Sequence, residues 1–284
     1  MSNVFIAQTV KEACELLASP NRIACAGATN LYVDRYFGKM LEPDLVSLHA
    51  IDELKRIEEY EDYWLIGSMV TFDQLENTLK GSGALEALSK AASLVGGPQI
   101  RNRGTIGGNI ISASPSADSL PVLMALDAQL LLQSSEGSRQ VAIQDFMTGV
   151  KRTDLKEGEL LTQIQIPKKT GHALFQKVGK RNALAIAVCN LCTYINIEEN
   201  QIKDIAIAIG SCAPTCVRAK EVEKSLLAWK KPADDNEWKL LKEKISEKLP
   251  LDICPIDDVR ATASYRKKVA ANIIFQQIKE LMEV

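Results

Sequence analysis

The stretch RNRGTIGGNIISASPSADS, residues 101–119, contains more glycine than an ordinary turn requires. Glycine permits positive φ and lets the backbone approach a ligand closely. Thr105 and Asn109 add a hydroxyl and an amide, and the carboxylate of Asp118 follows nine residues after Asn109. The glycines of the stretch are Gly104, Gly107 and Gly108. This combination predicts a binding loop, in which Asp118 is suited to accept hydrogen bonds from sugar hydroxyls.

Another loop of small residues, AGATN at 26–30, precedes this one in the chain and directly follows the segment RIAC, which has the pattern of a short buried strand. Small side chains leave backbone N–H groups uncovered, and such groups can form a nest that binds a phosphate. Taken alone, AGATN is more typical of a tight turn without function. Two such loops in one chain suit a dinucleotide, which carries two phosphates.

Neither loop matches the usual nucleotide-binding fingerprints. A Gly-x-Gly-x-x-Gly after a strand is absent, and VGKR at 178–181 lacks the first Gly and the Ser/Thr of a P-loop. Hydrolytic chemistry has little support, because His49 and His172 are the only histidines and no nucleophile elbow or zinc-binding helix motif occurs. We therefore predict no catalytic side chain and no metal site on this chain, and expect a bound cofactor to supply the reactive chemistry.

Composition excludes several other classes of protein. The 284 residues carry a net charge of −2, and 46% of them are hydrophobic, as in ordinary globular proteins. Nothing in this balance favours binding to nucleic acid or to an acidic membrane surface. No stretch reaches about 18 uninterrupted apolar residues, and the segment MSNVFIAQTV lacks the features of a signal peptide. We expect a cytoplasmic protein with no membrane insertion.

The seven cysteines do not form a recognisable framework, since their number is odd and their spacing irregular. Cys189 and Cys192 make one Cys-x-x-Cys, without the second pair or the histidines that a zinc site needs. The apolar residues around them indicate buried, reduced thiols. A redox motif or a cluster ligand remains the alternative.

Helix and strand signals alternate up to the polar segment KKTGH, 168–172, which we take as a domain boundary. Before it, TVKE at 9–12 and TFDQ at 71–74 are capping boxes that start helices. After it, residues 186–213 read as two strands joined by a polar turn, followed by amphipathic helices, the last at about 261–283. This order predicts an α+β fold whose C-terminal part is a small antiparallel sheet packed against about three helices.

Three segments, taken in order, resemble one family: AGATN, GPQIRNRGTIGGNIISASPSADSLPVLMALDA (97–128) and LFQKVGKRNALAIAV (174–188). They closely resemble the FAD-binding medium subunit of molybdenum hydroxylases, the enzymes of the xanthine, carbon monoxide and nicotinate dehydrogenase type. The resemblance covers essentially the whole chain. The pattern QIRN-x-GTIGGN followed by SP-x-x-D is highly specific, whereas AGATN is less so.

The resemblance implies an FAD-binding domain of the vanillyl-alcohol-oxidase (PCMH) type over residues 1–170. This domain would have two α+β subdomains, at about 1–55 and 56–170. A C-terminal α+β domain of the molybdenum-hydroxylase flavoprotein type would follow over residues 171–284.

The resemblance also implies which residues bind FAD, since both glycine loops of the family hold the FAD pyrophosphate. Asp118 matches a contacting Asp of the family, Val95 an apolar contact, and Leu161 and Lys177 lie where the family approaches the flavin ring. We expect Lys177 to face the pyrimidine end of that ring. The full set is Cys25, Ala26, Gly27, Ala28, Thr29, Asn30, Leu31, Val95, Thr105, Ile106, Gly107, Gly108, Asn109, Asp118, Leu161 and Lys177.

The first loop departs from the family pattern Ala-Gly-Gly-Thr-Asp. Ala28 replaces the second Gly, and Asn30 replaces the Asp. An alanine fits this position if its φ is negative. The chain has no additional cysteine-rich insertion, so we expect no iron–sulfur cluster on it.

The function implied by the resemblance is that of an electron-transfer subunit. A large subunit would carry the molybdenum–pterin cofactor and hydroxylate a purine or a related heterocycle, and a small subunit would carry two 2Fe-2S clusters. This chain would pass electrons from the clusters through FAD to NAD in a xanthine dehydrogenase-like enzyme of purine catabolism, assembled as a dimer of heterotrimers. The alternatives are a stand-alone FAD oxidoreductase of related fold and a scaffold subunit that has lost FAD.

Overall fold

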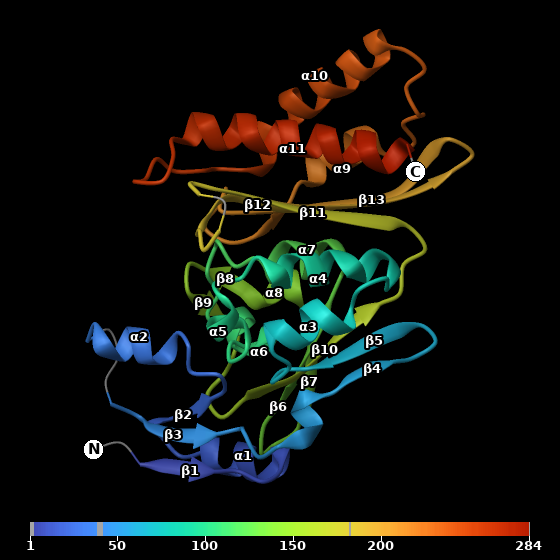
Figure 1. Cartoon of the computed structure of the whole chain (residues 1–284). Coiled ribbons are helices and arrows are strands. Elements are labelled where there is room, and N and C mark those ends of the chain that lie inside the picture. Colours follow the sequence, from blue (N-terminus) through green and yellow to red (C-terminus); the bar gives the residue numbers. More distant parts are fainter. Residues whose placement is uncertain (1–2, 39–41, 182, 284) are drawn as a thin grey trace.

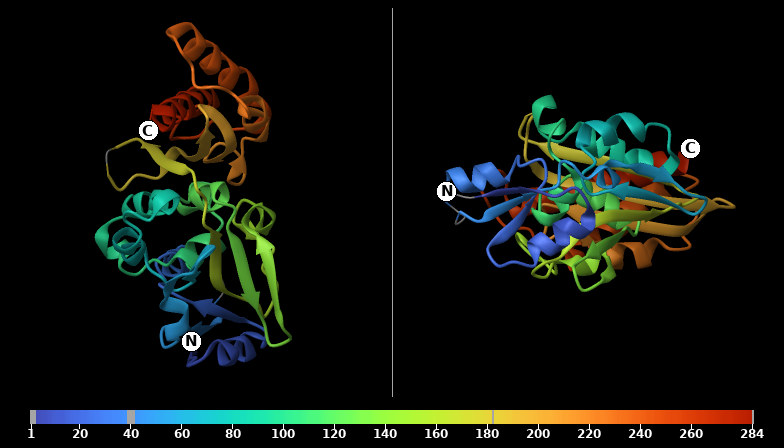
Figure 2. Two further views of the ribbon diagram at one scale, coloured as in Figure 1. Left: turned by 90° about the vertical axis from the view of Figure 1, so that its right-hand side faces the viewer. Right: turned by 90° about the horizontal axis from the view of Figure 1, so that it is seen from below.

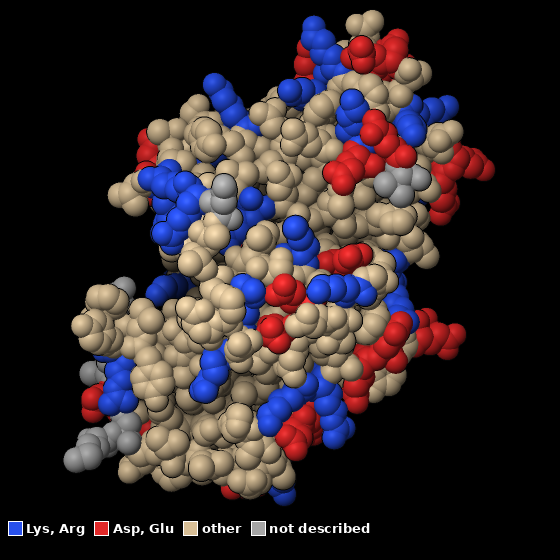
Figure 3. Space-filling model, viewed as in Figure 1, with Lys and Arg blue, Asp and Glu red and all other residues tan. Residues whose placement is uncertain are grey.

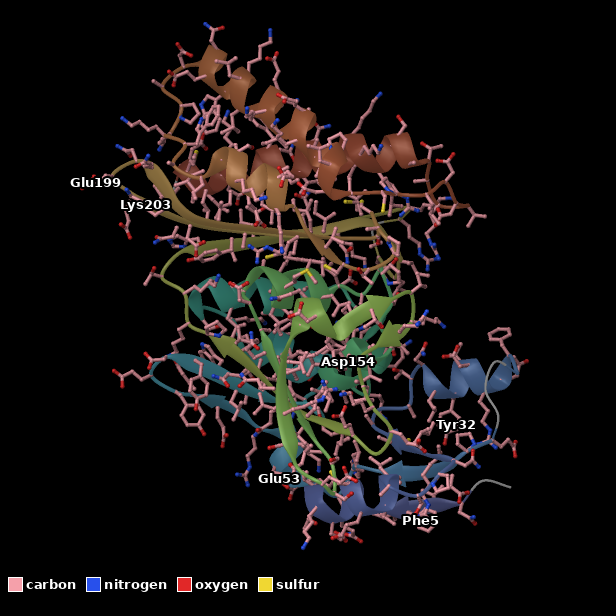
Figure 4. The ribbon with its side chains drawn as sticks, turned by 180° about the vertical axis from the view of Figure 1, so that it is seen from behind. Phe5, Tyr32, Glu53, Asp154, Glu199 and Lys203 are labelled. Atoms are coloured by element: carbon pink, nitrogen blue, oxygen red, sulfur yellow. The ribbon has the colours of Figure 1, made fainter. Side chains whose placement is uncertain are left out.

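A three-stranded parallel sheet forms the N-terminal lobe of the computed structural model, which describes residues 3–38, 42–181 and 183–283. The strand order is β1-β3-β2, and helix α1 covers the sheet through Ala13 and Leu17 (Figure 1). The elements of the lobe are β1 (Val4–Ile6), α1 (Val10–Leu17), β2 (Arg22–Cys25), α2 (Leu31–Tyr36) and β3 (Asp44–Ser47). Helix α2 buries none of its residues, and Figure 4 shows it, with Tyr32, standing out from the body of the chain.

The middle lobe is built on a five-stranded antiparallel sheet of order β4-β5-β10-β6-β7. Its strands are β4 (Ile57–Glu59), β5 (Tyr63–Gly67), β6 (Gln129–Gln133), β7 (Ser138–Ala142) and β10 (Leu160–Pro167), with a small ladder of β8 (Met147–Gly149) and β9 (Arg152–Thr153). The helices are α3 (Phe72–Thr78), α4 (Glu86–Ser93), α5 (Pro98–Arg101), α6 (Ile106–Ile111), α7 (Ser119–Ala125) and α8 (Ile143–Phe146), with short 3-10 turns at Asp52–Lys55 and Gly83–Leu85. These helices lie between the sheet and the C-terminal strands (Figure 1).

The predicted capping boxes form to different extents. At Thr71 the box is complete, because Thr71 accepts from the Gln74 amide and the Gln74 side chain accepts from the Thr71 amide. At Thr9 only one half forms: the hydroxyl accepts from the Glu12 amide at 3.1 Å, but the Glu12 carboxylate accepts from the Gln8 amide instead. Both helices nevertheless begin where the boxes predict.

The C-terminal sheet, of order β11-β12-β13-β14, separates two cores. Alternation along β12 sends Cys192 and Tyr194 toward α4 and α7, and Leu191 and Ile195 toward the C-terminal helices. Figures 1 and 2 show this layering. The elements are β11 (His172–Gly179), β12 (Ala187–Glu198), β13 (Gln201–Gly210), β14 (Val217–Arg218), α9 (Lys220–Leu226), α10 (Asp235–Asp252) and α11 (Ala263–Glu283). One face of this sheet therefore completes the core of the middle lobe.

These observations confirm the predicted α+β class and the small antiparallel sheet packed on three helices. The apolar pattern of ALEALSKAASLVGG, residues 84–97, predicts a helix ended by Gly96 and Gly97, but α4 is shorter, because a 3-10 turn precedes it and the chain leaves the helix at Leu94. Cys189 and Cys192 are buried free thiols; the hydrogen bond with Cys212, together with burial, raises the pKa of Cys189, and burial raises the pKa of Cys192. None of the described helices is long and apolar enough to cross a membrane.

Candidate cofactor site

A cavity of about 680 Å³ lies between the two small-residue loops, of which residues 26–30 are the first loop and residues 104–109 the second. The loops touch at Gly27, where a Cβ atom would lie 1.7 Å from the carbonyl oxygen of Arg103 and 3.2 Å from the Gly104 nitrogen. Only glycine permits this approach. The β2 strand delivers the first loop to the cavity, and the turn after α5 delivers the second.

The first loop offers unused backbone donors. Among the described residues, the N–H groups of Gly27, Ala28, Thr29 and Asn30 donate no hydrogen bond to the protein. All four residues line the cavity. Consecutive free N–H groups of this kind form a concave site for an anion such as a phosphate.

Ala28 adopts φ +60, so the condition under which an alanine fits this position without strain, a negative φ, is not met. A left-handed conformation costs an alanine about 1–2 kcal/mol relative to glycine. Alternation of right- and left-handed residues is what turns successive N–H groups toward one point. The Ala28 carbonyl also accepts from the Tyr32 amide at 3.2 Å, which fixes the loop to α2. The strained conformation of Ala28 is therefore maintained at the loop whose free N–H groups form the anion site.

The second loop uses its amides within the protein. The Gly107 amide donates to the Ser68 carbonyl at 2.9 Å, and the Gly108 amide donates to Thr105 Oγ1 at 3.1 Å. The Asn109 amide donates to the Thr105 carbonyl at 3.0 Å, and Asn109 Oδ1 accepts from Ser119 at 2.6 Å. Thr105 thereby starts α6 in spite of its two glycines. The glycines serve here to bring backbone close to the cavity.

The structure brings most of the predicted site residues together around the cavity. Those that line it are Cys25, Ala26, Gly27, Ala28, Thr29, Asn30, Leu31, Val95, Thr105, Gly107, Gly108, Asn109 and Leu161. Ile106 is fully buried behind them in α6. Asp118 and Lys177 are the other predicted residues that the cavity lining does not include.

Asp118 and Lys177 form a buried ion pair between the middle lobe and the C-terminal sheet. Lys177 Nζ lies 2.6 Å from Asp118 Oδ2 and donates to the Leu94 carbonyl at 3.0 Å, next to the cavity-lining Val95. Asn190 Nδ2 donates to Asp118 Oδ1 at 2.9 Å. Burial raises the pKa of the Asp118 carboxyl above its ordinary value, while Lys177 and Asn190 oppose that rise. The pair therefore joins the two parts of the chain beside the cavity.

The segment from Leu155 to Leu161 forms a cavity wall that sequence reasoning missed, apart from Leu161. Arg139 holds this wall, since its guanidinium donates to both carboxylate oxygens of Glu159 at 2.6 and 2.8 Å and to Asp154 Oδ2 at 2.6 Å. Asp154 is labelled in Figure 4. The hydrogen bond from Arg139 is the main reason why the pKa of Glu159 is lowered. Nothing in the local sequence distinguishes this turn from an ordinary polar loop.

Apolar side chains supply much of the remaining lining, and sequence reasoning missed these too. They include Leu48, Phe72, Ile100 and Ile111. Ser68, just after β5, also lines the cavity. On the face seen in Figure 3, the surface is hollowed between the lobe that carries α2 and the C-terminal part of the chain.

The donor set fits a dinucleotide with an aromatic ring system. Free backbone N–H groups suit phosphate oxygens, apolar walls suit flat rings, and the volume falls within the range of small-molecule sites. In the described part of the chain, no three His, Cys, Asp or Glu side chains gather as metal ligands would. The free N–H groups and the apolar walls suit the cavity to an organic cofactor.

Comparison with known protein families identifies this organisation. Residues 1–169 match the model of the FAD binding domain in molybdopterin dehydrogenase, and residues 175–281 match the model of the CO dehydrogenase flavoprotein C-terminal domain. The chain belongs to the FAD-binding subunits of the molybdenum hydroxylase family. The predicted family resemblance of the chain is thereby confirmed.

Individual relatives of this FAD-binding subunit span nearly its full length. It is 33% identical over 278 residues to the glyceraldehyde dehydrogenase medium chain of Sulfolobus acidocaldarius, covering 97% of this chain and 96% of the relative. It is 32% identical over 280 residues to the xanthine dehydrogenase FAD-binding subunit of Escherichia coli O157:H7, covering 96% and 94%. A chain of carbon monoxide dehydrogenase from Hydrogenophaga pseudoflava superposes with a TM-score of 0.89 at 26% identity, covering 99% of this chain and 96% of the other.

Proposed function

We propose that this chain is the cytoplasmic electron-transfer subunit of a xanthine dehydrogenase-like molybdenum hydroxylase, passing electrons from 2Fe-2S clusters on a small subunit through FAD to NAD. The observation that carries the proposal is the cavity with four free N–H groups at the first loop, in a chain of this family. The flavin, when bound, accepts electrons singly and releases them as a pair. No side chain of this subunit needs to act as an acid or base for that role.

The contribution of the chain itself is to bind and orient the cofactor. The N–H groups of residues 27–30 would hold its pyrophosphate, and the apolar wall with Val95 and Leu161 would hold its ring. The proposal keeps, as FAD contacts, all the residues of the two loops that the family resemblance implies. It also keeps Asp118 and Lys177 as FAD contacts, with support from the hydrogen bond that Lys177 donates to the Leu94 carbonyl, next to the cavity-lining Val95. We divide the chain into an FAD-binding domain over 1–170 and a C-terminal domain over 171–284.

The substrate would be chosen by the large subunit, which carries the molybdenum–pterin cofactor. Support for a purine comes from the identity of 32% to a xanthine dehydrogenase FAD-binding subunit. A glyceraldehyde dehydrogenase medium chain is 33% identical, so an aldehyde is the second candidate. Oxidation of xanthine compared with that of glyceraldehyde by the intact complex decides between them.

The experiment that tests the proposal is gentle purification of the complex from its native source. We expect two further chains to co-purify, with iron, molybdenum and FAD present, a mass that fits a dimer of heterotrimers, and reduction of NAD when xanthine is added. A chain that purifies alone with FAD and turns over a substrate would instead support a stand-alone flavoenzyme. A complex without FAD would support a scaffold subunit.

A further inference from the structure

Ser68 carries a buried hydroxyl that has no hydrogen-bond partner in the described part of the chain. The residue directly follows β5, is 4% exposed and lines the cofactor cavity. Its backbone is fixed on both sides, because its amide donates to the Thr162 carbonyl and its carbonyl accepts from the Gly107 amide, each at 2.9 Å. Rotation about the Cα–Cβ bond is the freedom that remains to this side chain.

The position is unfavourable for an unpaired hydroxyl, because buried polar groups in folded proteins almost always have partners. An alanine would fill nearly the same space without an unsatisfied oxygen. A larger side chain is excluded on one side, since even the missing Cβ of Gly107 would lie 2.6 Å from Ser68 Cβ. A hydroxyl beside a ligand cavity is best explained by a partner that arrives with the ligand.

We propose that Ser68 is a further cofactor-contacting residue, whose hydroxyl turns toward the cavity and forms a hydrogen bond with a polar atom of bound FAD. A serine hydroxyl donates one hydrogen bond and accepts up to two, so it can meet either an oxygen or a ring nitrogen. The inference rests on the proposed function, because it requires FAD in this cavity. Ser68 adds a side-chain contact where the first loop supplies backbone N–H groups.

Thr193 offers a matched control. Its Oγ1 is also buried without a partner among the described residues, but it lies on β12 and is not part of the cavity lining. Thr193→Val keeps the shape of the side chain and removes the hydroxyl. Ser68→Ala removes one atom from an enclosed site, so neither variant threatens the fold.

The test uses the full chain after its FAD has been removed. Titration with FAD, followed by flavin fluorescence, gives the Kd for FAD, and thermal unfolding gives the midpoint of the FAD-free chain. Ser68→Ala should raise the Kd for FAD about tenfold, which corresponds to the loss of one net hydrogen bond. The same change should leave the midpoint of the FAD-free chain equal or higher, because an unpaired group is removed. Thr193→Val should leave the midpoint equal or higher too, with the Kd unchanged.

Tight FAD binding by the parent together with an unchanged Kd in Ser68→Ala would overturn this inference alone. A lower FAD-free midpoint in Ser68→Ala would also contradict it, because it would mean that the hydroxyl is already paired in the empty protein. Failure of the parent chain to bind FAD would instead overturn the proposed function.

Discussion

The two small-residue loops resemble each other in sequence and differ in what their amides do. In the first loop, residues 27–30 leave their N–H groups free among the described residues, whereas Gly107, Gly108 and Asn109 of the second loop donate within the protein. The first loop is thus a donor surface, and the second is a close-packed support. The number of glycines alone does not distinguish these roles. It indicates how closely the backbone can approach a ligand, but not which backbone amides remain free to donate a hydrogen bond to it.

Room for a side chain also differs between positions of the two loops. Ala28 has a Cβ within the first loop and carries it at φ +60. A Cβ on Gly107 would lie 2.7 Å from the Ser68 carbonyl oxygen, inside contact distance. A Cβ is therefore tolerated at position 28 at the cost of strain, whereas there is no room for one at position 107.

The largest effect is expected where the two loops meet. Gly27→Ala places a methyl group 1.7 Å from the Arg103 carbonyl oxygen, so the loops must separate. We expect loss of FAD retention and a fall of about 3 kcal/mol in the free energy of unfolding, as for other overpacked sites. Urea unfolding and the ratio of flavin to protein absorbance measure both effects.

Gly149→Ala is the matched control, since its Cβ would make only ordinary contacts of 3.7 and 3.8 Å with Arg152. It should change both quantities little. If Gly27→Ala kept its FAD and its stability, the two loops would not depend on their contact.

The ion pair between Lys177 and Asp118, which lies at the end of residues 101–119, tests the support role of that part of the chain. Lys177→Met leaves the Asp118 carboxylate buried without its cation, and we expect a loss of about 3 kcal/mol at pH 8. The loss should be smaller at pH 5. The pKa of Asp118 is raised in the folded protein, and removing Lys177 raises it further. Between the ordinary and the raised pKa the folded state binds more protons, so stability increases as the pH falls.

Urea unfolding of the two proteins at pH 5 and pH 8 measures this dependence. Lys203→Met serves as the control, because Lys203 is exposed and its ammonium donates to the Gln201 side chain. An equal loss at both pH values would show that Asp118 does not titrate as its burial requires.

The smallest effect concerns the strain in the donor loop. Ala28→Gly relieves the strain of a left-handed alanine, which amounts to about 1–2 kcal/mol. The greater freedom of glycine in the unfolded chain offsets about 0.4–1 kcal/mol of this gain in the free energy of unfolding. We expect a net gain of about 0.5 kcal/mol, seen as a higher thermal midpoint. Ala24→Gly in β2 should lower the midpoint, because Ala24 lies in an ordinary strand. A lower midpoint in both variants would mean that Ala28 is not strained.

The sequence predicted the elements whose signals are local. The Thr71 capping box, the strands on either side of the polar turn at residues 199–200 and the long last helix follow from side chains a few residues apart. The motif resemblance also placed both loops at one site. The wall at Leu155–Leu161 could not be predicted, because Arg139 holds it from a strand fifteen or more residues away.

Three further features could not be predicted from the local sequence. Ala28 adopts a left-handed conformation that its own residue type disfavours. Lys177 pairs with a carboxylate fifty-nine residues away, which its neighbours on β11 do not indicate. Ser68 belongs to no recognised motif, and the feature that points to a role for it is a hydroxyl without a partner among the described residues.

The most direct test of the central claim, that the cavity between the two loops holds FAD, is the absorption spectrum of the full chain after incubation with FAD and gel filtration. The parent is compared with Gly108→Val, whose added Cβ would meet only Thr105 Oγ1, at 3.0 Å, while projecting a side chain at the cavity lining. We predict one FAD per parent chain, and no retained flavin in the variant at a nearly unchanged thermal midpoint. Equal flavin content in the two proteins would contradict the claim.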